Sequence, residues 1–502
     1  MTDPAFSTPT VDIQDSTTQL DREQAFGAGS NPTGSPVGGG DGYRDTVSQK
    51  GSGTNRPVTT TDELLAALSS AKSGDVIYID EMARIDLADA PMGMTIPEGV
   101  TLAGNRGERS TAGSAAYSFD IRVPGDYFLW VLASGEESGP IGVSVDGGGI
   151  RQWDLETDSH WRWSGGGAHY LSSGRHNLTI HWRESGLSLD GILITGDAGY
   201  LPDGAVGEQN GRGLIRMEAE SGVLSPLMET ARDPAASGGA YVSVPDSPDG
   251  DEYPVSPGGK IFLGSTTSNR PVGLVAGGEH VRITGIRLEG PDTGTGEVDH
   301  PGLGIYSAYR NLEVDNCEIW GWSGAAIGIA GTGGADMKTG GDIHHNYIHH
   351  CQMSGLGYGV VVSGGALSLI EANYFDYCRH AIAGSGVAGD GYEARYNICG
   401  PNFTAGSSHN FDMHGTASGS GTIAGDTIRI HHNTFMATGP LNAFPVAIRG
   451  VPRDGAYIDH NWFYYDLAPP VWQTGGQGNV FVTDNLIGQN GALSTSGPIE
   501  YY

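Results

Sequence analysis

Short segments of alternating apolar and polar residues recur along the second half of the chain, and each ends in the same way. A few alternating residues lead to an asparagine, then one further residue and an aromatic or aliphatic one. The copies read NLEVDNCEI, DIHHNYI, LSLIEANYF, YEARYNI, IRIHHNTF, YIDHNWF and NVFVTDNLI, with asparagines at Asn316, Asn346, Asn373, Asn397, Asn433, Asn461 and Asn485. Alternation with a period of two predicts a β-strand. Repetition every 20–50 residues or so predicts a solenoid or propeller.

Strands that recur at this interval stack on their copies in the next coil, so the pattern predicts a parallel β-helix. An asparagine at one turn of each coil bonds locally and to its stacked copy. We therefore expect the asparagines to form an internal ladder that does no chemistry. The histidines of the HHN and DHN phrases are expected to decorate the outer face of the strands.

A single convincing helix precedes the solenoid, in the segment TTDELLAALSSAKSG. Thr60 is placed to cap its N-terminus, Glu63 follows three residues later, and Gly74 lies past its end. Such a helix would cover the open first coil. Residues 1–55, rich in Ser, Thr, Pro and Gly, are expected to form a flexible or extended arm. The β-helix is assigned to residues 56–110 and 256–502.

Residues 111–255 interrupt the solenoid with a different pattern, denser in tryptophan and without the asparagine phrase. The segments LSSGRHNLTIHWRESGLSLDGILIT, MEAESG and ASGGAYVSV resemble carbohydrate-binding modules of families 6 and 35. The strand that closes those modules comes first here, so the insert resembles a circularly permuted β-sandwich of the jelly-roll type. Exposed loops tolerate such a cut.

The resemblance implies a structural Ca2+ site in this insert, since those modules bind calcium through carboxylates of the matching strands. The matching residues here are Asp190, Glu218 and Glu220, and oxygen ligands suit calcium. Surface carboxylates without an ion are the alternative. Trp161 and Trp163, two apart, would share one face of a strand and offer rings to a sugar. The alternative is that at least one belongs to the sandwich core; Trp153 is a further candidate.

The charge balance is strongly acidic. Asp and Glu number 58 against 27 Lys and Arg, giving a formal net charge of −31. The lysines are Lys50, Lys72, Lys260 and Lys338. An acidic, lysine-poor surface keeps a protein hydrated in concentrated salt, which favours a halophilic, archaeal source over an ordinary acidic secreted protein. The same charge disfavours nucleic acids and anionic membranes as partners, and no apolar run approaches the ~20 residues of a membrane span.

Two further features concern the compartment. Cys351 and Cys378 each follow a ladder asparagine by five residues, so they are expected to be stacked neighbours, either bonded as a disulfide or free as buried thiols. The N-terminus lacks the basic region and apolar core of a secretory signal. We expect a location outside the cell, on the cell surface or on a virion, reached by a replaced signal or another route.

Candidate chemistry gathers in the late coils, in the phrases RHAIAGSG, HNFDMHG and VAIRGVP. If Phe411 and Met413 point inward, alternation sends Asp412 and His414 outward, and Arg449 of the next coil falls beside them. We place His380, Glu393 and Arg395 one coil below on the same strip. The prediction is one concave strip that carries the candidate catalytic residues His380, Glu393, Arg395, Asp412, His414 and Arg449.

Two reactions fit these residue types. A lyase acting on a uronate polysaccharide needs a cation, a base and an acid, and Arg449, His414 and His380 are suitable. A glycosidase needs two carboxylates, which Asp412 and Glu393 would supply. Hydrogen bonding between coils is the alternative role for all of them.

The ladder coils and the capping helix resemble the pectin-lyase-like right-handed β-helix superfamily over about residues 57–110 and 256–502. That fold hosts polysaccharide lyases, glycoside hydrolases, epimerases and phage tailspikes, so it does not select a reaction. The metal-binding Asp pattern of pectate lyases and the paired Asp motifs of polygalacturonases are not found. The expected protein binds, and cleaves, an acidic polysaccharide. The alternative is a glycan-binding tailspike, capsid decoration or adhesin, in which the arm anchors a homo-oligomer or a larger particle to host glycan.

Overall fold

The computed structural model describes most of the chain in detail. The residues outside the description are 1–24, 48–56, 89, 109–112, 136–139, 147–149, 183–185, 207–212, 225–227, 245–254, 265, 267, 295–297, 299–300, 332–335, 403–408, 420, 439–443, 467, 496–498 and 502.

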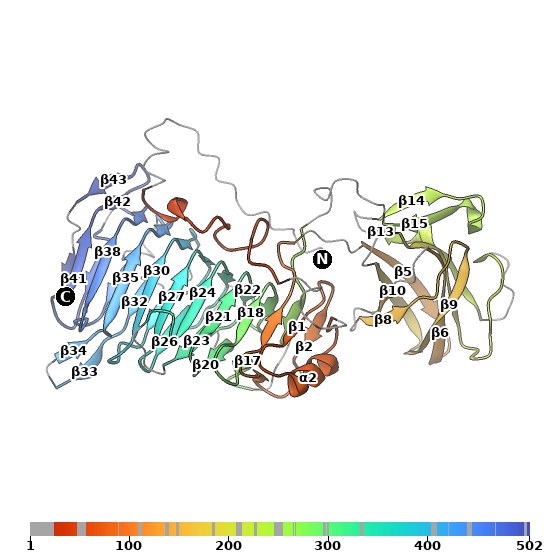
Figure 1. The fold of residues 1–502 in the computed structure, drawn as a ribbon, viewed down its shortest axis with the longest axis horizontal. Coiled ribbons are helices and arrows are strands. Elements are labelled where there is room, and N and C mark those ends of the chain that lie inside the picture. Colours follow the sequence, from red (N-terminus) through yellow and green to blue (C-terminus); the bar gives the residue numbers. More distant parts are fainter. Residues whose placement is uncertain are drawn as a thin grey trace.

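Three long, mainly parallel sheets run the length of a right-handed β-helix (Figure 1). The chain visits the first, second and third sheet in turn, so each coil adds one strand to each. The first sheet holds β1 (Val76–Tyr78), β4 (Thr101–Ala103), β18 (Arg282–Thr284), β21 (Leu312–Asp315), β24 (Gly341–His344), β27 (Leu367–Glu371), β30 (Gly391–Arg395), β35 (Thr427–His431), β38 (Gly455–Asp459) and β41 (Val480–Thr483).

The second sheet holds β2 (Arg84–Asp86), β16 (Lys260–Phe262), β19 (Arg287–Glu289), β22 (Glu318–Trp320), β25 (Tyr347–His349), β28 (Tyr374–Asp376), β31 (Ile398–Cys399), β36 (Thr434–Phe435), β39 (Trp462–Phe463) and β42 (Asn485–Ile487), and ends on the antiparallel β43 (Ala492–Ser494). The third sheet holds β3 (Met94–Ile96), β17 (Val272–Ala276), β20 (Leu303–Ser307), β23 (Ala325–Ala330), β26 (Tyr358–Ser363), β29 (His380–Gly384), β32 (Phe411–Met413), β37 (Val446–Ile448), β40 (Val471–Gln473) and β44 (Ile499–Tyr501). A hairpin of β33 (Thr416–Ser418) and β34 (Gly421–Ile423) projects after β32.

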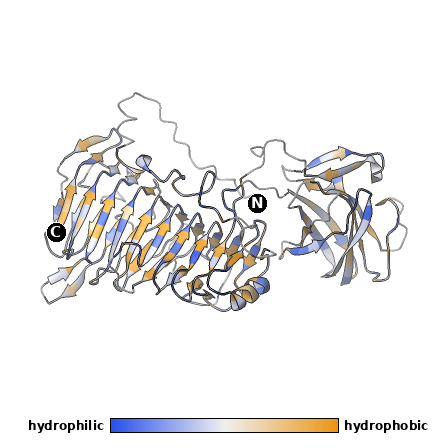
Figure 2. Ribbon diagram, viewed as in Figure 1, coloured by the Kyte–Doolittle hydropathy of each residue, from blue (hydrophilic) through white to orange (hydrophobic). Residues whose placement is uncertain are grey.

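The inside of the solenoid is filled by stacked apolar side chains, one row from each sheet. Ile319, Ile348 and Phe375 follow one another in register in the second sheet, and all are fully buried. Figure 2 shows the resulting alternation of apolar and polar positions along the strands. The period-two pattern of the sequence therefore reflects one face buried in every coil.

The turn between the first and second sheets carries the asparagine ladder. The Oδ1 atom of each asparagine accepts from the backbone N–H and the side-chain amide of the one before it, as from Asn397 to Asn433 at 3.0 and 2.9 Å. The ladder runs through Asn346, Asn373, Asn397, Asn433, Asn461 and Asn485. The inclusion of Asn316 was wrong: its backbone has a φ of 52° and Cys317 takes the ladder position, donating its N–H to Asn346.

Helix α2 (Thr61–Ser70) covers the first coil. Its capping box joins Thr60 and Glu63 as predicted. Leu64 and Leu68 are buried in the solenoid core, so the helix seals the apolar end that the first coil would otherwise expose to water.

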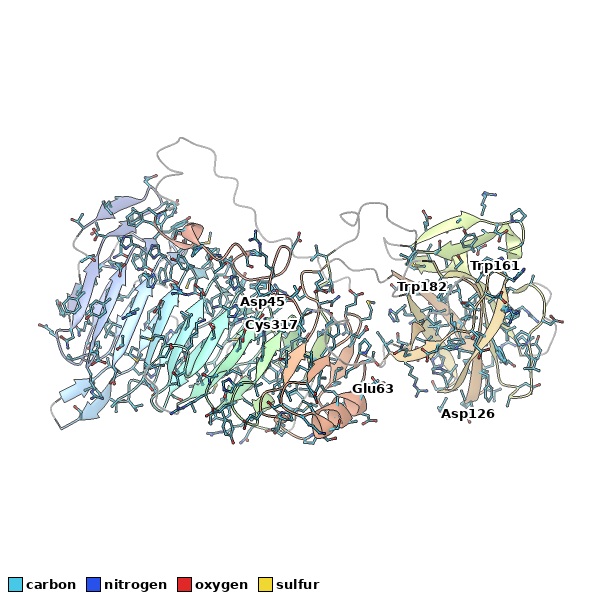
Figure 3. All side chains as sticks on the ribbon, viewed as in Figure 1. Asp45, Glu63, Asp126, Trp161, Trp182 and Cys317 are labelled. Atoms are coloured by element: carbon cyan, nitrogen blue, oxygen red, sulfur yellow. The ribbon has the colours of Figure 1, made fainter. Side chains whose placement is uncertain are left out.

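The β-sandwich is inserted between β4 and β16, at the turn between the first and second sheets (Figure 1). One of its sheets holds β13 (Val223–Leu224), β5 (Gly113–Ile121), β10 (Gly174–Trp182), β7 (Pro140–Val145) and β8 (Arg151–Asp154). The other holds β14 (Glu229–Arg232), β15 (Ala240–Ser243), β11 (Ser188–Thr195), β6 (Gly125–Ser134) and β9 (Arg162–Leu171), with β12 (Ile215–Glu218) paired to β11. Trp182, labelled in Figure 3, is fully buried between the two sheets.

Residues 25–47 lie along the outside of the solenoid, over the ladder turn (Figure 1). Near the late coils the N–H of Gly27 donates to the carbonyl of His460. Midway, the Thr33 hydroxyl lies 2.9 Å from Nε2 of His345. Near the early coils, Tyr43 donates to the buried Asp315 at 2.8 Å. The arm thus bonds to its own solenoid, and it covers histidines expected to be exposed: His345 is 5% exposed.

The four cysteines, Cys317, Cys351, Cys378 and Cys399, are free and buried. Burial raises the pKa of the Cys378 thiol, which is hydrogen-bonded to Cys351, so the stacked pair consists of two thiols. Among the described residues, no helix has the length and apolar character needed to cross a membrane.

Candidate functional site

A buried carboxylate stands at the centre of a polar cluster on the outer face of the third sheet. Phe411 and Met413 of β32 point into the core, so Asp412 between them points outward. It is nevertheless 0% exposed, because basic side chains cover it. We call Asp412 with His380, His409, His414 and Arg449 the Asp412 cluster.

Two partners hold Asp412 from the solvent side. The Arg449 Nε lies 3.0 Å from Oδ1 while its Nη2 contacts Oδ2, a two-point ion pair across neighbouring coils. The Nε2 of His414 lies 2.8 Å from Oδ2. The side chains of His414 and Arg449 remain 32% and 33% exposed, so they are the groups of the cluster that a ligand would meet.

The two remaining histidines close the cluster from inside. His409 Nε2 lies 3.2 Å from Asp412 Oδ2. Burial alone would raise the pKa of Asp412, but hydrogen bonds from His409 and His414 hold it well below its ordinary value. The cluster therefore keeps an ionised carboxylate away from water, which requires this many donors.

His380 is neutral. Its Nδ1 donates to the His409 carbonyl at 2.8 Å, leaving a lone pair on Nε2, which has no hydrogen-bond partner among the described residues. Burial and the nearby His409 lower the pKa of His380 to about 3. The one ring proton of neutral His380 is bound to the His409 carbonyl and the side chain is fully buried, so the geometry does not fit the acid role predicted for it.

His380, His409 and Asp412 also bring three potential metal ligands together. The rings of the two histidines are stacked, with centroids 4.2 Å apart and planes at 11°. Ring-nitrogen lone pairs lie in the ring plane, so those of stacked rings run parallel and do not converge on one ion. Arg449 already occupies both oxygens of the carboxylate. We therefore assign no metal to the cluster.

Glu393 and Arg395 do not join the Asp412 cluster; their placement on its strip was wrong. Both belong to β30 of the first sheet, because their strand leads directly into the ladder asparagine Asn397. There Glu393 accepts from Arg395 at 2.8 Å and lies 3.3 Å from His431. The hydrogen bond with His431 and the charge of Arg395 lower the pKa of Glu393 to about 2. The pair of carboxylates expected for a glycosidase is thus split between two sheets.

The predicted calcium ligands of the sandwich lie on paired strands: β11 carries Asp190, and β12, which ends at Glu218, pairs with it. Asp190 is fully buried, and its Oδ2 accepts from the N–H of Ser237 at 2.8 Å. Glu218 accepts from the Ser237 hydroxyl. Burial and the charges of Glu218 and Glu220 raise the pKa of Asp190 to about 7. One oxygen of each carboxylate (Asp190 Oδ1, Glu218 Oε2 and Glu220 Oε2) is buried without a hydrogen-bond partner among the described residues, so the group is short of positive charge.

The three tryptophans proposed for sugar binding differ. Trp153 packs in the sandwich core, where its ring lies against Gly166. Its assignment as a sugar-binding residue was therefore wrong. Trp161 and Trp163 are half-buried. Their indole N–H groups donate to Asp233 and to the Gly204 carbonyl, respectively, so a ligand would meet the ring and not its donor. Trp161 is labelled in Figure 3.

The sequence interpretation missed three neighbours of the site. His409 is three residues before Asp412, within the HNFDMHG phrase itself. Tyr358 stacks on His380, and Trp472 lies 6.2 Å from His409 by ring centroids. Tyr358 and Trp472 come from coils two steps before and after β32, and only the strand register brings them together.

The fold and site define an all-β protein, a right-handed β-helix with an inserted β-sandwich. No protein-family model matches the chain, and no curated protein matches it. Among solved structures, a GH26-CBM35 β-(1,4)-mannanase of Podospora anserina is similar over 18% of this chain and 21% of its own, at 15% identity and a TM-score of 0.16. The chain thus spans about a fifth of that structure's length.

Two further structures are similar over more of the chain. The catalytic unit of a GH87 α-1,3-glucanase from Streptomyces thermodiastaticus is similar over 74% of each chain, at 12% identity and a TM-score of 0.23. The Agl-KA catalytic domain covers 77% of this chain and 88% of its own, at 9% identity and a TM-score of 0.18. At these values the likeness transfers no residue and no activity to this chain.

Proposed function

We propose that this protein binds an acidic polysaccharide on its third sheet and cleaves it by β-elimination. One observation carries the proposal: Asp412 holds a histidine and an arginine side by side, each about one-third exposed. A uronate-directed lyase needs a base next to a cation. A hydrolase needs a second carboxylate, and Asp412 is the one carboxylate in the described part of this cluster.

Each group has a role that follows from its contacts. Arg449 pairs with the uronate carboxylate and so favours loss of the C5 proton. With Nε2 of His414 directed at Asp412, the free Nδ1 is the base, and Asp412 is a positioning residue. The C5–H and C4–O4 bonds break and a C4–C5 double bond forms. The leaving oxygen takes a proton from water, because Tyr358, whose ring lies 6.2 Å from that of His414, is buried and donates its O–H to the carbonyl of Gly355.

The test is turnover of a panel of uronate polysaccharides in concentrated KCl with calcium. Unsaturated products are followed by ultraviolet absorbance and new chain ends by reducing-sugar assay. We expect unsaturated products from the wild type, lost in His414→Ala and Arg449→Ala. Arg395→Ala is the matched control, since Arg395 is also one-third exposed and ion-paired, but on the first sheet. Reducing ends without unsaturation, or equal losses in the control, contradict the proposal.

A second candidate is a protein that binds glycan without cleaving it, such as a tailspike, capsid decoration or adhesin. The observation in its favour is the complete burial of Asp412 and His380, which suits a rigid binding surface as well as a catalytic one. Retained glycan binding with no product from any substrate would leave this candidate standing.

We also propose that the sandwich is a carbohydrate-binding module with a structural calcium ion. The donor set fits calcium: three carboxylates from β11, β12 and the following turn have buried oxygens without partners. Asp190, Glu218 and Glu220 would hold the ion, which would supply the missing positive charge and fix the strands. An added binding module raises the local substrate concentration.

The acidic, lysine-poor composition supports a high-salt setting. With 58 acidic and 27 basic side chains, the protein depends on salt to screen its own repulsion. Unfolding midpoints measured in low and concentrated KCl test this directly: stability should rise with salt.

A further inference from the structure

We propose that Trp472 and Phe444 form a sugar-stacking subsite that determines substrate length and direction. This deepens the proposed function and rests on it. The ligand is an acidic oligosaccharide of at least two residues that extends from the Asp412 cluster toward the C-terminal coils, along the solenoid axis.

The strand register places Trp472 in line with Asp412. Asp412 pairs with Ala447, and Ala447 pairs with Trp472, in successive strands of the third sheet. Val471 and Gln473 on either side of Trp472 are fully buried, so alternation directs its ring to the same outer face as Asp412. Trp472 therefore stands two strands from the carboxylate, ~10 Å along the axis, about the length of a disaccharide.

The rings near the cluster form an aromatic row beside the polar groups. Phe444 lies 5.8 Å from Trp472 by ring centroids, and Trp472 lies 6.2 Å from His409. Phe444 and Trp472 are half-buried, whereas Tyr358, His380 and His409 are buried. Among the residues of the Asp412 cluster and these rings, the partly exposed side chains are His414, Arg449, Phe444 and Trp472, two basic and two aromatic. Their chemistry matches an anionic sugar joined to a sugar with an apolar face.

The alternative role for Trp472 is packing within the protein. The dependence of affinity on oligosaccharide length distinguishes sugar stacking from packing. The probes are galacturonate, guluronate and mannuronate oligomers of one to four residues, titrated calorimetrically. In the wild type, affinity should rise from one residue to two or three. Trp472→Ala should weaken binding of di- and trisaccharides about tenfold and leave the monosaccharide unchanged, while Trp472→Phe retains most of the gain. Arg449→Ala should weaken binding at every length.

Tyr457→Ala is the matched control: Tyr457 lies in the same coil, on the first sheet, and is 43% exposed. Equal thermal midpoints for the two alanine variants establish that both fold. If Trp472→Ala keeps the wild-type length dependence, as Tyr457→Ala should, the subsite is disproved while the proposed function stands. If the wild type binds none of the oligomers, the proposed function fails and the subsite with it.

Discussion

Arg449 and Asp412 form a two-point ion pair between neighbouring coils of the third sheet, with Nε 3.0 Å from Oδ1 and Nη2 against Oδ2. The planar guanidinium matches the two carboxylate oxygens. The Asp412 carboxylate is buried, whereas the Arg449 guanidinium is partly exposed to solvent. The ion pair therefore joins a buried negative charge to a positive charge at the surface.

Replacing Asp412 by Asn should destabilise the protein by about 1–3 kcal/mol, since the donors of Arg449 and two histidines lose their ionised acceptor. Denaturant unfolding followed by circular dichroism measures the change. Asp426→Asn is the control: Asp426 pairs with Arg453, which is half-exposed, and such a pair contributes about 0–1 kcal/mol. Equal losses in the two variants would show that the Asp412 cluster has no special stability.

The solenoid was predictable because its signals are local and repeated, whereas the site depends on which sheet a strand joins. YEARYN and HNFDMHG look alike as alternating phrases, yet only the first runs directly into a ladder asparagine, Asn397. The short separation between Glu393 and Asn397 assigns Glu393 to the first sheet, and this separation could be read from the sequence. The contact between Tyr358 and His380 was not, because it depends on the register between coils.

Asn316 shows a second limit of the sequence pattern. It precedes an apolar pair as the other asparagines do, but the register pairs Asp315 with His344 and so sets Asn316 beside His345. A shift of one residue changes its partners entirely: its Oδ1 accepts from Gly40 of the arm and from Arg106. The docking of the arm likewise left no periodic signal, because its contacts are mainly backbone and glycine.

Removing one rung of the ladder should cost more than removing an exposed amide. In Asn397→Ala, the N–H and side-chain amide of Asn373 lose their acceptor inside the protein. Unsatisfied buried donors cost about 1–3 kcal/mol each, so we expect a loss of roughly 2–4 kcal/mol in urea unfolding. Asn490→Ala, at an exposed site of the last coil, should change stability by less than about 0.5 kcal/mol. A ladder variant as stable as this control would refute the structural role.

Acid should destabilise the solenoid through the histidines of the ladder turn. Burial and the neighbouring His344 lower the pKa of His345 to about 4, and burial likewise lowers the pKa of His432 to about 4. The ordinary value is about 6.5. Between these values the unfolded chain binds more protons, so stability rises with pH and is lost as pH falls from 6.5 to 4.

His345→Asn tests that origin, because asparagine tolerates the left-handed backbone at this position. Stability measured by urea unfolding at several pH values should depend less steeply on pH in this variant. His280→Asn is the control, since His280 has the same backbone conformation but is exposed. The Thr33 hydroxyl of the arm contacts Nε2 of His345, so protonation of His345 should also loosen the arm. As the pH is lowered, protease should therefore begin to cleave the arm at a higher pH in wild type than in His345→Asn. If stability depends on pH in the same way in wild type, His345→Asn and His280→Asn, then His345 is not the cause of the acid destabilisation.

Calcium removal should destabilise the sandwich, and more so at neutral than at acidic pH. The pKa of Asp190 is raised to about 7 by burial and by Glu218 and Glu220. Without a cation the folded state holds a proton that the unfolded state releases above about pH 4, so stability falls as pH rises toward 7. Calcium binds the ionised form and reverses this trend, with a gain of about 2.7 kcal/mol at a hundred times its Kd.

Thermal unfolding with calcium or with a chelator at pH 5 and pH 7 measures the difference. For the wild type the stabilisation by calcium should be larger at pH 7, because acid protonates the ligands. Asp190→Asn should lose most of it, and Asp154→Asn, at an exposed position of the same sandwich, should keep it. If the thermal midpoint of the wild type is the same with calcium and with chelator at both pH values, no calcium binds to Asp190, Glu218 and Glu220. The calcium site that the sequence implies for this module would then be disproved.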